Sequence, residues 1–265
     1  MRLLVITQTV DVADSQLGFF TSWIDKLSQE VDKTEVICLK KGDYHAPENS
    51  VIYSLGKELG RRSRFVYTYR FFKILFKIRG KYTHVFVHMN QDYVLLAGLM
   101  WWFQGVPVGL WRNHYSGSFL TRLAVGLSSV SFATSRDSYT ARFPKTVFMP
   151  VGVDIARFPK KISPKQKRII CIGRLSSSKH TSELVQAFKL FHEKNPDFVL
   201  DIVGSIDPGQ ESYIEEVKKY VDDKLVHNKI TINYSLPFFE AGEWAIRNAG
   251  ILNKKIFIFH GTEDN

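Results

Sequence analysis

The feature that most constrains the fold is a repeated alternation of short apolar runs with longer segments of helical periodicity. The apolar runs of the first half, which predict strands, are residues 2–7, 34–39, 83–89, 107–111, 130–135 and 146–152. The helical segments between them are residues 19–29, 92–103 and 118–127. Strands that alternate with helices are joined by right-handed crossovers into a mostly parallel sheet covered on both faces. We therefore expect an α/β fold.

The alternation stops once and then restarts, which predicts two Rossmann-like domains. Residues 155–168 contain two prolines and many lysines but little core material, as a linker would. Strands are predicted again at 168–173, 197–205 and 229–235, with helices at 182–194 and 213–225. The predicted parts are a first domain at 1–154, a linker at 155–168 and a second domain at 169–265. The second domain is expected to be incomplete, because a whole one needs about 150 residues.

Cellular location follows from the cysteines and the apolar segments. Cys38 and Cys171 each lie in an apolar run, where a thiol behaves as a small core residue. The apolar start of the chain is too short for a signal peptide, which favours a cytoplasmic protein. Residues 93–111 approach the length of a membrane span, but Gln104, Gly105 and Pro107 interrupt them. A buried helix followed by a buried strand is the favoured interpretation, with a span as the alternative.

Two motifs at the domain junctions resemble a known enzyme family. MPVGVDIARF (149–158) ends the first unit, and IICIGRLSSSKHTSELVQAF (169–188) opens the second. Together they resemble the retaining nucleotide-sugar glycosyltransferases of the GT-B fold, called group 1 or family 4, over residues 1 to about 235. The resemblance implies transfer of a hexose from a nucleotide sugar to a saccharide or lipid-linked acceptor, as in cell-envelope polysaccharide synthesis.

The second motif has the chemistry of a diphosphate site. A helix N-terminus carries unpaired N–H groups and a partial positive charge, and Gly173 lets the backbone approach a ligand. Arg174 and Lys179 would add charge-assisted bonds to phosphate oxygens. In the family, the arginine and lysine at these positions neutralise the leaving diphosphate in place of a metal, so the resemblance implies no cofactor and no metal. The alternative is a plain strand-to-helix turn with exposed basic side chains.

Two positions in the first half are further candidates. His114 follows a strand end, where ligands of open parallel sheets collect, and a histidine of the corresponding family loop lies near the transferred sugar. His114 is thus the candidate catalytic residue, with a helix-capping role as the alternative. Gly18 is the one glycine of the loop after the first strand, where the family has a glycine-rich turn, so it is the candidate for the acceptor-side loop.

The basic residues are concentrated in one segment. Between Lys57 and Lys81 there are nine basic residues and one acid, interleaved with aromatic and aliphatic side chains. Such a helix could lie on an anionic membrane surface, which would place the protein peripherally on the inner face of the membrane. The alternative is a helix packed on the sheet with a solvated basic face. Nucleic acid is an unlikely partner, because no nucleic-acid-binding motif accompanies the segment. The candidate membrane-surface residues are Arg61, Arg62, Arg64, Arg70, Lys73 and Lys77.

One family feature is missing. Family members carry two glutamates eight positions apart late in the second domain. After Val203, no glutamate of this sequence is followed by a second glutamate eight positions later. The sequence therefore resembles a C-terminally truncated member, for which we expect weak or absent transferase activity. The alternative function is a non-catalytic remnant that binds a membrane surface or an acceptor.

Overall fold

The computed structural model describes residues 1–14, 16–149, 167–173, 175–204, 206, 209–221 and 230–233. The chain divides into two compact units, Met1–Gly152 and Val153–Asn265, which are described separately. The predicted linker at 155–168 lies outside the described residues except for its last two positions.

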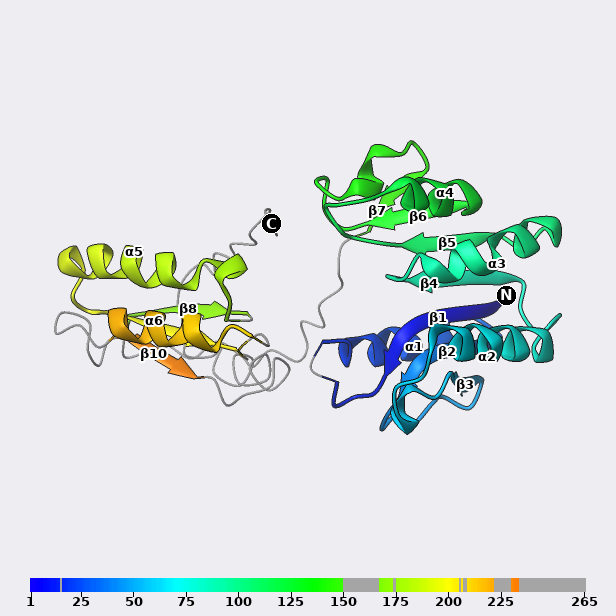
Figure 1. Cartoon of the computed structure of the whole chain (residues 1–265), viewed down its shortest axis with the longest axis horizontal. Helices are drawn as coiled ribbons and strands as arrows, with labels where there is room; N and C mark the ends of the chain where they lie inside the picture. Colours follow the sequence, from blue (N-terminus) through cyan, green and yellow to red (C-terminus); the bar gives the residue numbers. More distant parts are fainter. Residues whose placement is uncertain are drawn as a thin grey trace. The chain divides into compact units, whose positions relative to one another are not determined.

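Unit 1 is a seven-stranded parallel sheet with helices on both faces (Figure 1). Its strands lie in the order β3-β2-β1-β4-β5-β6-β7. They are β1 (Arg2–Val10), β2 (Lys33–Lys41), β3 (Ser50–Ser54), β4 (His84–His88), β5 (Val108–Trp111), β6 (Val130–Ala133) and β7 (Thr146–Phe148). The helices are α1 (Phe19–Gln29), α2 (Arg64–Lys77), α3 (Asp92–Phe103) and α4 (Phe119–Leu127). The predicted parallel α/β sheet is confirmed.

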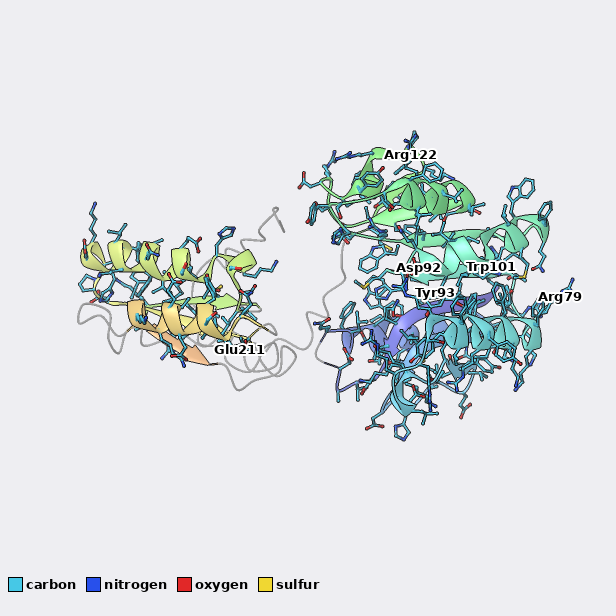
Figure 2. The ribbon with its side chains drawn as sticks, in the orientation of Figure 1. Arg79, Asp92, Tyr93, Trp101, Arg122 and Glu211 are labelled. Carbon is cyan, nitrogen blue, oxygen red and sulfur yellow. The ribbon has the colours of Figure 1, made fainter. Side chains whose placement is uncertain are left out.

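Two core clusters hold the layers of unit 1 together. Helices α2, α3 and α4 pack on one side of the sheet through a single cluster, whose buried aromatic members include Phe71 and Tyr82. Tyr93 and Trp101 of α3 belong to the same cluster (Figure 2). Helix α1 contributes Phe20 and Ile24 to a separate cluster with β1 and β2. The sheet is therefore covered on both faces, as parallel sheets require.

The predicted element bounds agree closely with the structure, with one omission. Helices α1 and α3 have the predicted ends. The omitted element is β3, whose five residues pair with β2 at the sheet edge. The basic segment forms α2, whose Phe71 and Leu75 side chains are buried in the core between this helix and the sheet. That packing is the alternative considered for this helix.

Unit 2 repeats the pattern on a smaller scale. Its described strands are β8 (Lys167–Ile172), β9 (Phe198–Val203) and β10 (Ile230–Asn233), which are parallel in the order β10-β9-β8. Helices α5 (Thr181–Lys194) and α6 (Glu211–Val221) pack on them. Val185, Phe188, Leu200, Ile214 and Val217 form the centre of its core.

The apolar segment at 93–111 divides between α3 and β5, as the favoured interpretation predicted. Within the described part of the chain, no helix combines the length and the hydropathy needed to cross a bilayer.

Candidate functional site

The strand order places a ligand-binding position at the centre of the unit 1 sheet. The chain leaves β1 toward β2 on one side, whereas from β4 it moves to β5 on the other side. In open parallel sheets, ligands bind outside the carboxyl ends of the strands where the order reverses. That position lies between the ends of β1 and β4.

Two depressions meet at this position. One has a volume of about 330 Å³ and is lined by Gln8, Met89, Asn90, Gln91, Asp92 and Arg112. The other, of about 410 Å³, is lined by Gln8, Thr9, Asp14, Gln16, Leu17, Lys40, Lys57 and Met89. Because Gln8 and Met89 line both, we treat the two as one region and call it the switch-point cleft.

Two residues that line the first depression each carry a buried polar atom that has no partner within the described residues. These atoms are Oε1 of Gln91 and Nη1 of Arg112. The other guanidinium nitrogen, Nη2, donates to the carbonyl of Ser116 at 2.9 Å and so holds the Arg112 side chain in place. Burial lowers the pKa of Arg112, but a guanidinium remains charged at neutral pH. A buried donor and a buried acceptor that lack partners favour a ligand able to supply both.

Met89, which lines both depressions, has an unusual backbone conformation. Its φ angle is +66°, in the left-handed region that side chains with a Cβ rarely adopt. Such strain costs about 1–3 kcal/mol and gathers at binding sites. Met89 directly follows β4, so the strained residue lies at the rim shared by both depressions.

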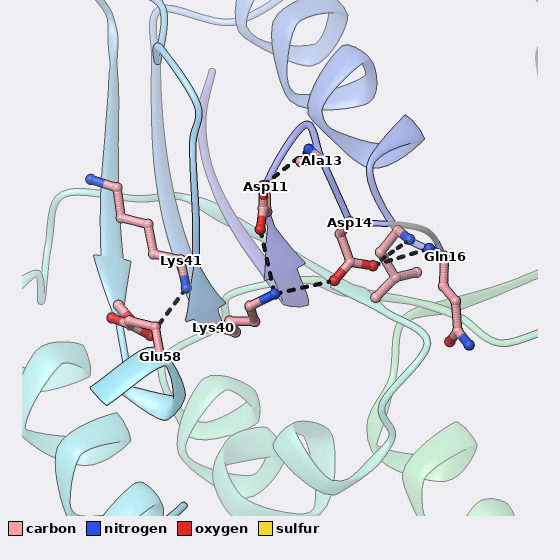
Figure 3. A network of polar contacts seen from close by, with 9 residues as sticks. Asp11, Ala13, Asp14, Gln16, Lys40, Lys41 and Glu58 are labelled. Atoms are coloured by element: carbon pink, nitrogen blue, oxygen red, sulfur yellow. Dashed lines mark hydrogen bonds and ion pairs between the residues drawn. The ribbon is translucent and has the colours of Figure 1, made fainter. Parts of the chain in front are cut away.

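A polar network fixes the wall of the second depression (Figure 3). The Lys40 ammonium lies 3.4 Å from Asp11 and 3.6 Å from Asp14. Asp14 in turn accepts hydrogen bonds from the backbone N–H groups of Gln16 and Leu17. These contacts hold the segment between β1 and α1 against the end of β2.

The residue before Met89, His88, ends β4 and lines neither depression. The His88 ring is fully buried and stacks between Phe20, at 3.9 Å between centroids, and Trp111, at 4.8 Å. Its Nδ1 lies 3.0 Å from the Thr7 hydroxyl, and Nε2 has no hydrogen-bond partner in the described chain. Burial lowers the pKa of His88 to about 3, so the imidazole is neutral at physiological pH.

His88 should make unit 1 less stable in mild acid. Between pH 6.5 and about 3, the unfolded chain binds a proton at His88 that the folded chain does not, so stability falls as the pH falls. The contribution between pH 7 and pH 5 should be about 2 kcal/mol. Urea unfolding of the wild type and of His88→Phe, which keeps the stack, measures it. Equal losses on acidification in both proteins would contradict the prediction.

The two sequence-predicted residues of unit 1 lie beside the cleft but do not line it. His114 is exposed on the loop after β5, where its Nδ1 accepts from the Ser116 N–H at 3.1 Å. This bond favours the tautomer with the proton on Nε2. Gly18 precedes α1, and its carbonyl accepts from the Thr21 hydroxyl at 2.7 Å. Any residue type can adopt its φ of −56°, so the position does not require glycine, and Gly18 is the N-cap residue of α1.

In unit 2 the predicted diphosphate turn is partly described. Gly173 directly follows β8, and a Cβ added to it would have open space within 4 Å. Arg174 lies outside the described residues. Lys179 ends a short 3-10 turn, Ser177–Lys179, and α5 begins two residues later, after His180 in the left-handed region. Lys179 is therefore on the turn and not in the helix.

Hydrogen bonds to α6 and to the residue just before it hold this turn and the start of α5 in place. The Ser177 N–H donates to Gln210 Oε1 at 3.1 Å, and the Ser182 N–H donates to the Tyr213 hydroxyl at 2.8 Å. Glu183, in the first turn of α5, lies 3.2 Å from His180 Nδ1. A backbone hydrogen bond and the bond from His180 hold the pKa of Glu183 below its usual value. The anchored turn thus keeps a carboxylate near the helix start, which would oppose an anion unless nearby cations outweigh it.

The predicted membrane-surface residues lie on and just before α2. Arg61, Arg62, Arg64, Lys73 and Lys77 are exposed. Arg70 is partly buried and donates to the Leu55 carbonyl at 2.6 Å, which ties α2 to the end of β3.

A family comparison matches unit 2. Residues 153–237 match the family model Glycosyl transferases group 1. This segment includes β8, the anchored turn, α5, β9 and α6. The predicted resemblance to group 1 glycosyltransferases is confirmed for these residues. Among curated proteins, none matches the chain.

Solved structures match nearly the whole chain in fold. HepE from Anabaena, in complex with UDP and glucose, has a TM-score of 0.61 at 17% identity, covering 91% of this chain and 71% of that one. Sucrose-phosphate synthase from Thermosynechococcus elongatus gives 0.62 at 13%, with 95% and 74% covered. An E. coli structure titled trehalose-6-phosphate bound with UDP-2-fluoro glucose gives 0.58 at 10%, with 89% and 74% covered. The predicted GT-B fold is confirmed, and at these identities the likeness shows the fold alone.

Part of the cleft was expected from the sequence, because the loop after the first strand, which begins at Gln8, was the predicted acceptor-side loop, whereas Met89, Gln91 and Arg112 were not candidates. Gln8, Met89, Gln91 and Arg112 come from three different strand ends. The available signal was their position just at or after predicted strands in the centre of the sheet, where polar residues follow apolar ones.

Proposed function

We propose that this chain transfers a hexose from a nucleotide sugar to a hydroxyl of a saccharide or lipid-linked acceptor, with retention of configuration. The observation that carries the proposal is the match of residues 153–237 to group 1 glycosyl transferases, together with the anchored turn that the segment contains. The bond from the anomeric carbon to the diphosphate breaks with its electron pair leaving on the diphosphate, a bond to the acceptor oxygen forms on the same face of the sugar, and the proton of the acceptor hydroxyl is taken up by the leaving diphosphate.

The donor diphosphate is assigned to the turn after β8. Gly173 leaves space for the ligand to approach the backbone, while Arg174 and Lys179 neutralise the phosphate oxygens. Charge grows on the leaving phosphate during the reaction, so fixed cations there stabilise the transition state more than the ground state. These side chains take the place of a metal ion. Two cations are also needed to outweigh Glu183 at the start of α5.

The acceptor is assigned to the switch-point cleft. A sugar hydroxyl both donates and accepts a hydrogen bond, which suits Gln91 Oε1 and Arg112 Nη1, the buried atoms without partners. Both depressions are open enough for a sugar ring. His114, two residues beyond Arg112 on the same loop, would contact the transferred sugar through Nε2.

The reaction is proposed to take place at the inner face of an anionic membrane. The exposed basic residues of α2 and of the segment before it support this location, because juxtamembrane Lys and Arg side chains bind anionic headgroups. A lipid-linked acceptor would be presented there.

Calorimetric titration of the purified chain with UDP and GDP tests the donor assignment. We expect UDP to bind, since HepE and the E. coli structure were solved with UDP or a UDP-sugar. Binding of GDP instead would keep the enzyme assignment and change the donor. If neither nucleotide binds, the donor site is not functional, and the alternative of a non-catalytic remnant that binds an acceptor or a membrane replaces the proposal.

A further inference from the structure

Helix α3 is apolar on every side, yet the described residues cover only one of them. Beyond Asp92 it contains no charged residue, and Tyr93, Val94, Ala97 and Trp101 fill the inner side. Leu96, Leu99, Trp102 and Phe103 are exposed, the last two at 65% and 78%. A helix that is apolar all round is normally buried or in contact with a membrane.

The neighbouring helix continues this surface. Helices α3 and α4 pack together, with Gly98 allowing a close approach of Leu127. The exposed side of α4 presents Phe119, Leu120 and Leu123, with Phe119 exposed at 75%. We call the seven large apolar side chains that the two helices expose the α3–α4 apolar face. They are Leu96, Leu99, Trp102, Phe103, Phe119, Leu120 and Leu123. Large apolar side chains exposed together on two packed helices mark an interaction site.

Charge indicates what covers this face. Residues 61–127, which the structure describes throughout, contain ten basic residues and a single acid, Asp92. Helix α2 lies in the same layer as α3, joined to it by the ring contact of Phe71 with Tyr93 at 5.1 Å. Its own outer side combines exposed Phe65, Tyr69 and Phe76 with arginine and lysine. The ten basic residues within 61–127 are Arg61, Arg62, Arg64, Arg70, Lys73, Lys77, Arg79, Lys81, Arg112 and Arg122.

We infer that the α3–α4 apolar face inserts into the interfacial layer of an anionic bilayer, while the basic residues around α2 bind the lipid headgroups. Exposed Trp, Phe and Leu beside Lys and Arg is the composition of helices that lie in the plane of a membrane. At about 18 Å, a helix of twelve residues is too short to cross a hydrocarbon core of about 30 Å. In a symmetric pair of chains, by contrast, two strongly basic surfaces would face each other and repel.

This inference rests on the membrane location proposed above and adds the residues that insert. It is independent of sugar transfer, so the two can fail separately. The test is sedimentation of the purified chain with vesicles of phosphatidylcholine alone or mixed with phosphatidylglycerol. We expect binding to the anionic vesicles and little to the neutral ones.

Two variants separate insertion from headgroup binding. Leu99→Ser with Trp102→Ser should weaken binding to anionic vesicles at least tenfold, because both side chains lose their contact with the acyl region. Arg61→Gln, Arg62→Gln and Arg64→Gln combined should weaken it roughly hundredfold, at about fivefold per residue. The matched control is Leu190→Ser, at an exposed leucine of α5 in unit 2, which should leave binding unchanged.

Other outcomes would overturn the inference. If the wild type binds neither vesicle, or the Leu99/Trp102 variant binds as well as the wild type, the face does not insert. If the chain is instead a dimer in solution that this variant dissociates, the face is an interface between copies. The UDP titration of the same variants reports on the nucleotide site. The transferase proposal is therefore tested independently of membrane binding.

Discussion

Replacing Arg174 with alanine should weaken UDP binding by between one and two orders of magnitude. A hydrogen bond between charged partners contributes about 1.5–3 kcal/mol, and 1.4 kcal/mol corresponds to a factor of ten in Kd. The loss should be large because Glu183 stays at the start of α5, where its charge opposes the diphosphate once a cation is removed. Calorimetric titration of the variant with UDP measures the change.

Lys179→Ala should also weaken UDP binding, but less than Arg174→Ala. A lysine ammonium is a point charge and lacks the paired, fixed N–H donors of a guanidinium. Lys194→Ala is the matched control. It removes the same charge from the other end of α5, about 20 Å along a helix of 14 residues. An equal loss of UDP affinity in the control would mean that the general positive charge of the chain attracts the nucleotide, and would count against a specific diphosphate site.

Trp101→Ala should lower the free energy of unfolding of unit 1 by about 3–5 kcal/mol. Trp101 is fully buried in the core between the sheet and the α2–α3–α4 layer (Figure 2). Its Nε1 donates to the Tyr82 hydroxyl at 3.1 Å, so the substitution leaves both a cavity and a buried hydroxyl without its donor. Urea unfolding followed by circular dichroism measures the loss.

The adjacent tryptophan provides the control. Trp102→Ala should change the unfolding free energy by about 0.5 kcal/mol or less, since the side chain is 65% exposed. The same substitution should reduce vesicle binding, which Trp101→Ala should not do in protein that remains folded. Comparable destabilisation by both substitutions would show that Trp102 packs against something within the chain, and the α3–α4 apolar face would then not be free to meet a membrane.

Local periodicity predicted most of the elements because it reports which side of each segment is apolar. Helix α1 was recognisable from Phe20, Trp23, Ile24 and Leu27, and the structure buries Phe20 and Ile24. Strand β3 was missed because it has only five residues at the edge of the sheet, too few for a clear alternation. The basic segment predicted a helix, but its composition suited a sheet-packed helix and a membrane-surface helix equally.

Of the two candidate regions, only the turn after β8 was proposed from the sequence as a whole stretch. The turn at 173–179 is one continuous stretch, so its residue types could be interpreted as a unit. The switch-point cleft brings together Gln8, near the end of β1, and Gln91 and Arg112, which follow β4 and β5. They are neighbours only because β1, β4 and β5 pair side by side. Their pairing depends on crossovers that sequence spacing does not encode.

The sequence by itself determined the α/β alternation, the break in it after Asp154 and the resemblance of residues 149–188 to group 1 glycosyltransferases, because each depends on residues close together in the chain. The tertiary structure alone decided which polar atoms converge at the switch-point cleft and which side of α3 stays uncovered. A helix that is apolar all round carries no amphipathic signal, so only its packing against β5 and α4 shows that Trp101 points inward and Trp102 outward.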